Sequence, residues 1–326
     1  MHLDKEEQKT IKHPTPLAAG LLYLIVLVLM LLTSFLLGGY KLKGNSYYAV
    51  MLVVQLAVIL VPPLVYMLYA NIDIKRSARL NRISIPELFL TAGMAVFGYG
   101  AIIPINLIWY YFLSRFGTPR TPEMPPIETP AQYLMALIVI ALVPALIEEF
   151  LFRGTIMRGY EKYSRRTSVL LTGLLFSLLH LQVMSLPSIL LMGILLSYIV
   201  NRSNTIFTGV VYHFVNNAIA VTIAFLTGIL NKLLPITQAG VPDINDITQQ
   251  DMIAAIIVWL FLGAVSFVLF SGCLAGFYFV TKDKQEKAEA AAKRPRAAEV
   301  IPVLVSVVII AALLVLEIFA MAGSAA

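Results

Sequence analysis

The sequence is poor in charged residues. Only 13% of its 326 residues are Asp, Glu, Lys or Arg, whereas 59% are hydrophobic. A soluble globular domain carries about 25% charged residues, so this chain has too few to cover a water-facing surface. Several apolar runs with almost no charge exceed the ~18 residues that a bilayer crossing requires. The composition therefore predicts an integral membrane protein.

Cysteine is almost absent as well. The single cysteine, Cys273, lies inside an apolar run, which excludes a disulfide framework and a cysteine-based metal site. The net charge of +6 does not indicate a nucleic-acid partner. The basic residues sit in short loops between apolar runs, where charge sets membrane topology.

The apolar runs predict an all-α, polytopic transmembrane bundle of about nine helices, of which the fifth and sixth are short for a full crossing. The nine runs are residues 17–37, 48–70, 87–114, 131–157, 167–182, 186–200, 204–227, 252–280 and 301–322. We divide the chain into an N-terminal three-helix region (1–130), a core (131–227) and a C-terminal pair of helices (228–326). A charged linker, 282–299, joins that pair.

The distribution of Lys and Arg predicts the orientation. If the N-terminus is cytoplasmic, most of the 24 basic residues fall in inside segments, as the positive-inside rule requires. The exceptions, which fall outside, are Lys41, Lys43, Arg115, Arg120 and Lys232. We therefore expect a cytoplasmic N-terminus, a cytoplasmic linker at 282–299 and an outer C-terminus, in a bacterial plasma membrane.

Polar residues are costly inside a bilayer and point to function there. Three apolar segments carry them in short patterns: Glu148, Glu149 and Arg153; Phe176 and His180; and His213 and Asn217. The spacing of four in Glu149–Arg153 and in His213–Asn217 puts each pair on one helix face. With ~1.5 Å of rise per residue, we place Glu148, His180 and His213 at ~12–20 Å below the cytoplasmic surface. Interhelical hydrogen bonding alone would explain one such residue, but matched depth on three helices predicts a site.

The three patterns, EExxxR, FxxxH and HxxxN in this order, resemble the CPBP family, also called the Abi family. It comprises CAAX prenyl endopeptidases and bacteriocin-processing or immunity proteins. The resemblance covers roughly residues 130–225 and implies an intramembrane endopeptidase. It makes Glu148 the residue that activates water and His180 a second contact to that water. His213 and Asn217 would hold the oxyanion, while Glu149 and Arg153 would support the helix.

The resemblance leaves a metal open. Glu148, His180 and His213 could supply three ligands to Zn²⁺, but a metal-free glutamate mechanism better explains Asn217 and is favoured. Two motifs of other intramembrane proteases, H-E-x-x-H and Gly-x-Gly-Asp, are missing from the sequence.

The expected partners are the lipid bilayer and a membrane-associated peptide, either prenylated or carrying a leader; the oligomeric state is left open. A non-catalytic peptide binder, such as a bacteriocin self-immunity protein, is the alternative function. A transporter or channel is a third, weakened by the lack of an inverted repeat. We expect Glu317 at the outer interface, and Asn106, Trp109 and Trp259 in packing or interfacial anchoring.

Overall fold

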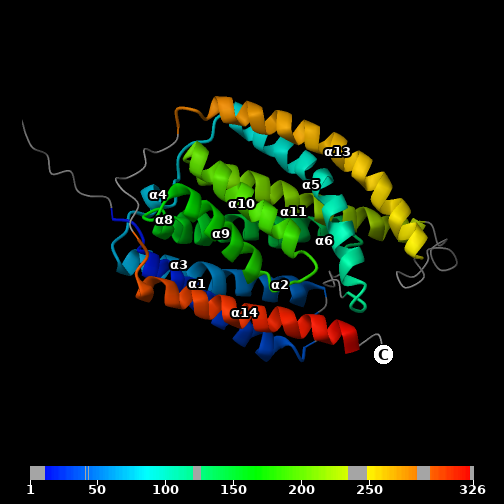
Figure 1. Cartoon of the computed structure of the whole chain (residues 1–326), viewed down its shortest axis with the longest axis horizontal. Helices are drawn as coiled ribbons and strands as arrows, with labels where there is room; N and C mark the ends of the chain where they lie inside the picture. The colour runs from blue at the N-terminus through cyan, green and yellow to red at the C-terminus, as the bar shows by residue number, and fades with distance from the viewer. Residues whose placement is uncertain are drawn as a thin grey trace, which may run out of the picture.

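The computed structural model describes residues 12–40, 42, 44–119, 126–233, 248–284 and 294–323, and over these ranges the chain forms helices and no strand (Figure 1). In chain order the helices are α1 (Pro16–Leu37), α2 (Asn45–Val54), η1 (Gln55–Leu60), α3 (Val61–Tyr69), α4 (Ile74–Ser77), α5 (Ile85–Leu113), α6 (Pro130–Ala136), η2 (Leu137–Leu142), α7 (Val143–Glu149), η3 (Phe150–Ile156), α8 (Met157–Tyr160), α9 (Arg165–Leu179), α10 (Leu186–Ser203), α11 (Ile206–Leu233), α13 (Gln249–Val280) and α14 (Ala297–Gly323).

Eight spans within the described residues are long and apolar enough to cross a membrane: α1, α2 to α3, α5, α6 to α8, α10, α11, α13 and α14. The remaining apolar run, the fifth (167–182), forms α9, which has only 15 residues. The predicted polytopic helical bundle is confirmed. The sixth run is longer than expected, because α10 continues to Ser203 and reaches 18 residues.

Several helices begin where the local sequence satisfies their free backbone N–H groups. At the start of α6, Thr129 Oγ1 accepts a hydrogen bond from Gln132 N at 3.2 Å, and Gln132 Oε1 accepts one from Thr129 N at 3.1 Å. Thr248 and Asp251 make the same reciprocal pair at the start of α13. These capping boxes fix where the helices begin.

Proline shapes the span that runs from α6 to α8. Pro144 has no N–H to donate to the carbonyl of Ile140, and in a regular α-helix its ring would clash with that carbonyl. The chain instead forms the π-helical turn η2 just before Pro144. The π-helical turn η1 likewise precedes Pro62 and Pro63. A third π segment, η3, follows Glu149, and such turns occur frequently at functional sites.

Helices α9 and α10 form a tight antiparallel hairpin in the middle of the bundle. A Cβ on Gly173 would lie 2.7 Å from the backbone N of Ile194, and one on Gly193 would lie 2.7 Å from the carbonyl O of Gly173. The two backbones therefore approach as closely as glycine allows, which is common where membrane helices pack. This contact sets the position of the loop 180–185 between them.

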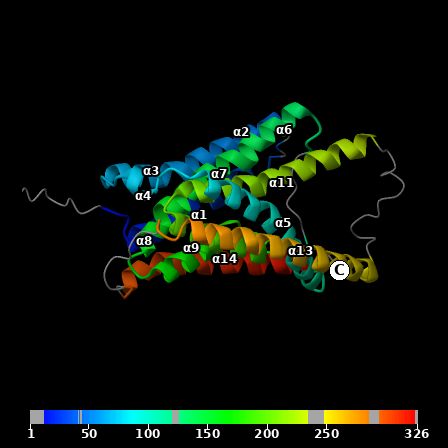
Figure 2. The same cartoon turned by 90° about the horizontal axis from the view of Figure 1, so that it is seen from above.

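The C-terminal helices lie along the N-terminal ones (Figures 1 and 2). Helix α13 packs along α5, and α14 packs along α1 and also contacts α9. Their outer faces are apolar and open: Phe261 and Val268 of α13 are 71% and 68% exposed. Such faces suit contact with lipid, as an integral membrane protein requires.

The segments expected on the cytoplasmic side meet at one end of the bundle. Arg79 NH2 lies 2.7 Å from Glu161 Oε1, and Arg158 NH1 lies 2.9 Å from Glu161 Oε2. Asn201 Nδ2 donates to Glu161 Oε1 at 3.0 Å. Burial raises the pKa of Glu161, but Arg79 and Arg158 outweigh it and hold that pKa below its usual value. The carboxylate thus joins the turn after α4, helix α8 and the end of α10.

Candidate active site

The fourth span places a buried ion pair at the centre of the bundle. Arg153 NH1 lies 2.7 Å from Glu149 Oε1, and both side chains are 0% exposed. This is the predicted pair at a spacing of four. Arg153 NH2 also donates to the carbonyl of Gly193 at 2.8 Å, and its guanidinium lies 4.6 Å from the centre of the Phe176 ring. Because a buried charge is costly without partners, these contacts hold Arg153 in one place.

Glu149 also joins the fourth span to α11. Its Oε1 lies 3.1 Å from His213 Nδ1, and His213 is 2% exposed. Helix α11 can come this close because residue 209 is glycine. A Cβ there would lie 2.5 Å from Glu149 Oε2 and 2.7 Å from Val200 Cγ2. The spacing of residues in the sequence predicts a contact of Glu149 with Arg153 but not with His213.

His180 ends α9 and is oriented by its own helix. Its Nδ1 lies 2.8 Å from the carbonyl O of Phe176. A carbonyl can only accept, so Nδ1 carries the proton and the neutral ring has a lone pair on Nε2. The Phe176 ring packs edge-on against both imidazoles, at 4.8 Å from His180 and 5.7 Å from His213. The second and third motifs therefore meet across this phenyl ring.

Asn217 contacts η2, the π-helical turn before α7. Its Nδ2 donates to the carbonyl O of Ile140 at 3.3 Å, the carbonyl that Pro144 cannot serve in an α-helical register. Asn216 Nδ2 makes a long contact of 3.4 Å to Asn217 Oδ1. One N–H of the Asn217 amide thus donates to a protein carbonyl.

Glu148 is half-buried and contacts Gln55, which belongs to none of the three motifs. Gln55 Nε2 donates to Glu148 Oε1 at 3.1 Å, while Gln55 Oε1 is buried without a partner. Gln55 is the one amide in the apolar run 48–70, and this isolation was the signal available in the sequence. Glu148 also lies within electrostatic reach of His180. The structure thereby brings all three motifs to one place.

Two further residues hold the loop that follows His180. The backbone N–H of Val183 donates to Glu317 Oε2 at 3.1 Å, and Trp109 Nε1 donates to the carbonyl O of Val183 at 2.8 Å. Val183 itself is 3% exposed and packs with Leu113 and Met321. Trp109 packs against this cluster, as expected, and Trp109 and Glu317 also fasten this loop from α5 and α14.

Glu148, His180 and His213 are the zinc ligands that the resemblance leaves open. Within the residues that the structure describes, no group of three or more His, Cys, Asp or Glu side chains is spaced to hold a metal ion. His180 and His213 turn Nδ1 to protein acceptors, as metal-ligating histidines also do. Glu148, His180 and His213, the candidate zinc ligands, do not form such a group of three.

The central part of the chain matches a known family. Residues 130–219 match the family model described as Rce1-like, type II CAAX prenyl endopeptidase. No curated protein and no solved structure matches the chain. The matched range contains every motif residue from Glu148 to Asn217, whereas Gln55, Trp109 and Glu317 lie outside it.

Proposed function

Because residues 130–219 form an Rce1-like domain of the CAAX-type intramembrane endopeptidases, we propose that this chain hydrolyses membrane-associated peptides with a water activated by Glu148. The convergence of Glu148, His180, His213 and Asn217 around one region carries the proposal. The substrates we propose are peptides that reach the bilayer through a lipid group, such as a prenyl chain, or through a leader segment.

The proposed general base is Glu148. Its carboxylate removes a proton from water as the water oxygen attacks the scissile carbonyl carbon, and the proton then passes to the departing amine as the C–N bond breaks. Gln55 fixes one carboxylate oxygen at 3.1 Å. His180 presents the Nε2 lone pair, because its Nδ1–H faces the carbonyl of Phe176. That lone pair can accept the second hydrogen of the water, so two acceptors would orient it.

The proposed oxyanion donors are His213 and Asn217 on α11. Glu149 Oε1 accepts from His213 Nδ1, so His213 can donate from Nε2 only as an imidazolium. The buried carboxylate of Glu149 stabilises that charge. This assigns Glu149 a positioning role: it links the charge of Arg153 to the donor that faces the oxyanion. Asn217 adds its second N–H, and preorganised donors of this kind stabilise the tetrahedral intermediate.

We propose that this chemistry needs no metal. The support is the spacing of the candidate ligands: Glu148, His180 and His213 do not form a group of three that could hold a metal ion. The test is activity after exhaustive chelation, with the metal content of active protein measured. Stoichiometric zinc whose removal abolishes cleavage would overturn the metal-free mechanism and leave the peptidase assignment standing.

The decisive variant is Glu148→Gln, which keeps the shape of the side chain and removes its basicity. General-base catalysis contributes about 10²–10⁴-fold, so cleavage of a lipidated test peptide should fall by that factor. Glu128→Gln is the matched control, because Glu128 pairs with Lys232 at the surface, where its side chain is 41% exposed.

We expect a set of membrane peptides to accumulate uncut in cells that carry the Glu148→Gln protein but not in cells that carry the wild-type protein. Retained turnover by folded Glu148→Gln protein would refute the role of Glu148. If neither protein cleaves peptides and both still protect cells against a bacteriocin, the non-catalytic binding function replaces the peptidase function.

A further inference from the structure

A cavity of about 400 Å³ lies between α5, α10, α11 and α13, beside the candidate active site but not part of it. On α11, Tyr212 and Asn216 line the cavity, while the next residue after each, His213 and Asn217, contacts the fourth span. One helix thus separates the two features. The cavity has the size and the mostly apolar lining of small-molecule sites.

The wall formed by α5 and α13 is closed by direct contact. A Cβ on Gly100 would lie 2.6 Å from Ser266 Oγ, and one on Gly263 would lie 2.7 Å from Pro104 Cγ. The cavity therefore lies on the side of this contact that faces α10. At its edge, Leu191 and Phe267 line the cavity and are 46% and 59% exposed. In a protein of this class that exposure faces lipid, so the cavity is reached from the bilayer.

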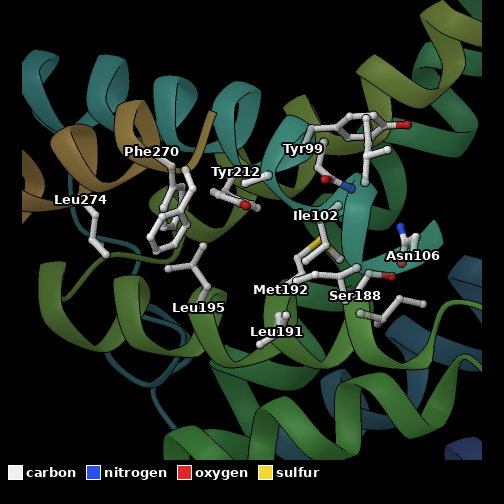
Figure 3. Close-up of a pocket in the computed structure, with 17 residues that line it drawn as sticks. Tyr99, Ile102, Asn106, Ser188, Leu191, Met192, Leu195, Tyr212, Phe270 and Leu274 are labelled. Carbon is white, nitrogen blue, oxygen red and sulfur yellow. The ribbon is translucent and has the colours of Figure 1, made fainter. Parts of the chain in front are cut away.

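The two ends of the cavity differ in polarity. Phe270, Leu274 and Leu195 lie at one end, whereas Asn106 and Ser188 lie at the other (Figure 3). Eight residues of α5 separate Gly98 from Asn106, which corresponds to ~12 Å at the helical rise. An elongated molecule with one polar end fits this shape.

The polar end contains an unsatisfied acceptor. Asn106 Oδ1 is buried and has no hydrogen-bond partner. Ser188 does not serve it, because its hydroxyl donates to the carbonyl of Ser185 at 2.9 Å. A buried acceptor without a donor is costly in an apolar environment, so a ligand that brings a donor to Asn106 would remove that cost.

We infer that this cavity binds one hydrocarbon chain of a lipid whose head carries a hydrogen-bond donor, with the head at Asn106 and the chain toward Phe270 and Leu274. The inference concerns binding and does not require that the protein cleaves peptides. The same chain chemistry could come from a bilayer lipid or from the lipid group of a substrate. Either source would place a ligand directly against α11.

Two photoreactive probes test the inference on the full chain in detergent micelles. One is a long-chain alcohol with a diazirine near its end; the other is its methyl ether, which has the same chain and no donor. The alcohol should label peptides containing Leu195 or Phe270 about three- to tenfold more efficiently than the ether, as expected for one hydrogen bond. Asn106→Leu should abolish that preference. Equal labelling by both probes in the wild-type protein would overturn the donor requirement.

A pair of tryptophan variants tests the position. Leu195→Trp fills the cavity and should reduce labelling by the alcohol, whereas Val268→Trp, on the open face of α13, should not. Equal labelling of the two variants would refute binding in this cavity. Competitors then identify the source: loss of labelling with phospholipid assigns a bilayer lipid, and loss with a farnesylated peptide assigns a substrate lipid. Labelling that neither competitor reduces would also overturn the inference.

Discussion

Substitution of Gly209 by Ala should disable the site through a single methyl group. The added Cβ would lie 2.5 Å from Glu149 Oε2 and 2.7 Å from Val200 Cγ2. Non-bonded heavy atoms pack at ~3.5 Å, so Glu149 or α11 must move by ~1 Å. The carboxylate cannot swing aside freely, because its Oε1 is held by Arg153 at 2.7 Å and by His213 at 3.1 Å.

The expected magnitudes follow from these contacts. Overpacking a filled interior costs about 1–3 kcal/mol, and loss of the buried Glu149–Arg153 contact would raise this toward ~3–5 kcal/mol. A displacement of ~1 Å at a catalytic group can cost on the order of 10²-fold in rate. Because His213 moves with Glu149, we expect kcat to fall by about that factor, with a smaller change in KM.

The assay is cleavage of a lipidated peptide by purified protein, with the thermal unfolding midpoint measured in the same detergent. Gly272→Ala is the matched control: Gly272 lies within α13, and a Cβ there meets nothing within 4 Å. Gly209→Ala with Val200→Ala should recover part of the activity, because the new methyl group can then move away from Glu149. Full activity and unchanged stability of Gly209→Ala would refute the close approach of α11 to Glu149.

Three further predictions concern contacts away from this position. Glu317→Ala should lower kcat about tenfold, since an unpaired Val183 N–H costs about 1–3 kcal/mol. Glu317→Gln keeps an acceptor for that N–H and should retain activity; equal loss of activity in both variants would contradict the loop contact. Glu161→Gln should lower the thermal unfolding midpoint at neutral pH, because the pKa of Glu161 is held below its usual value in the folded protein. The carboxylate stabilises the fold above its unfolded pKa near 4.5 and loses this effect as the pH falls through the lower folded pKa. The difference in midpoint between the variant and the wild type should therefore shrink below about pH 4.5. In a cysteine-free background, an impermeant maleimide should label Lys232→Cys in intact cells and Arg166→Cys only after permeabilisation, and the reverse pattern would invert the proposed orientation.

The sequence alone determined the class of the protein and the contacts within single helices. Long uncharged apolar runs can only be satisfied in a bilayer, so the helical bundle was predictable. The Glu149–Arg153 pair was predictable because a spacing of four places two side chains on one helix face. The resemblance to a known family also identified the three motifs, all of which fall inside the matched range.

Only the tertiary structure decided which helices supply the partners. Gln55 contacts Glu148 across 93 positions of sequence, and Glu317 reaches Val183 across 134. Periodicity describes one helix at a time and contains no information on which helix packs beside it. The need for glycine at position 209 is likewise invisible in the sequence, because it arises from a carboxylate on another helix. The active-site environment is therefore a property of the packed bundle rather than of any single segment.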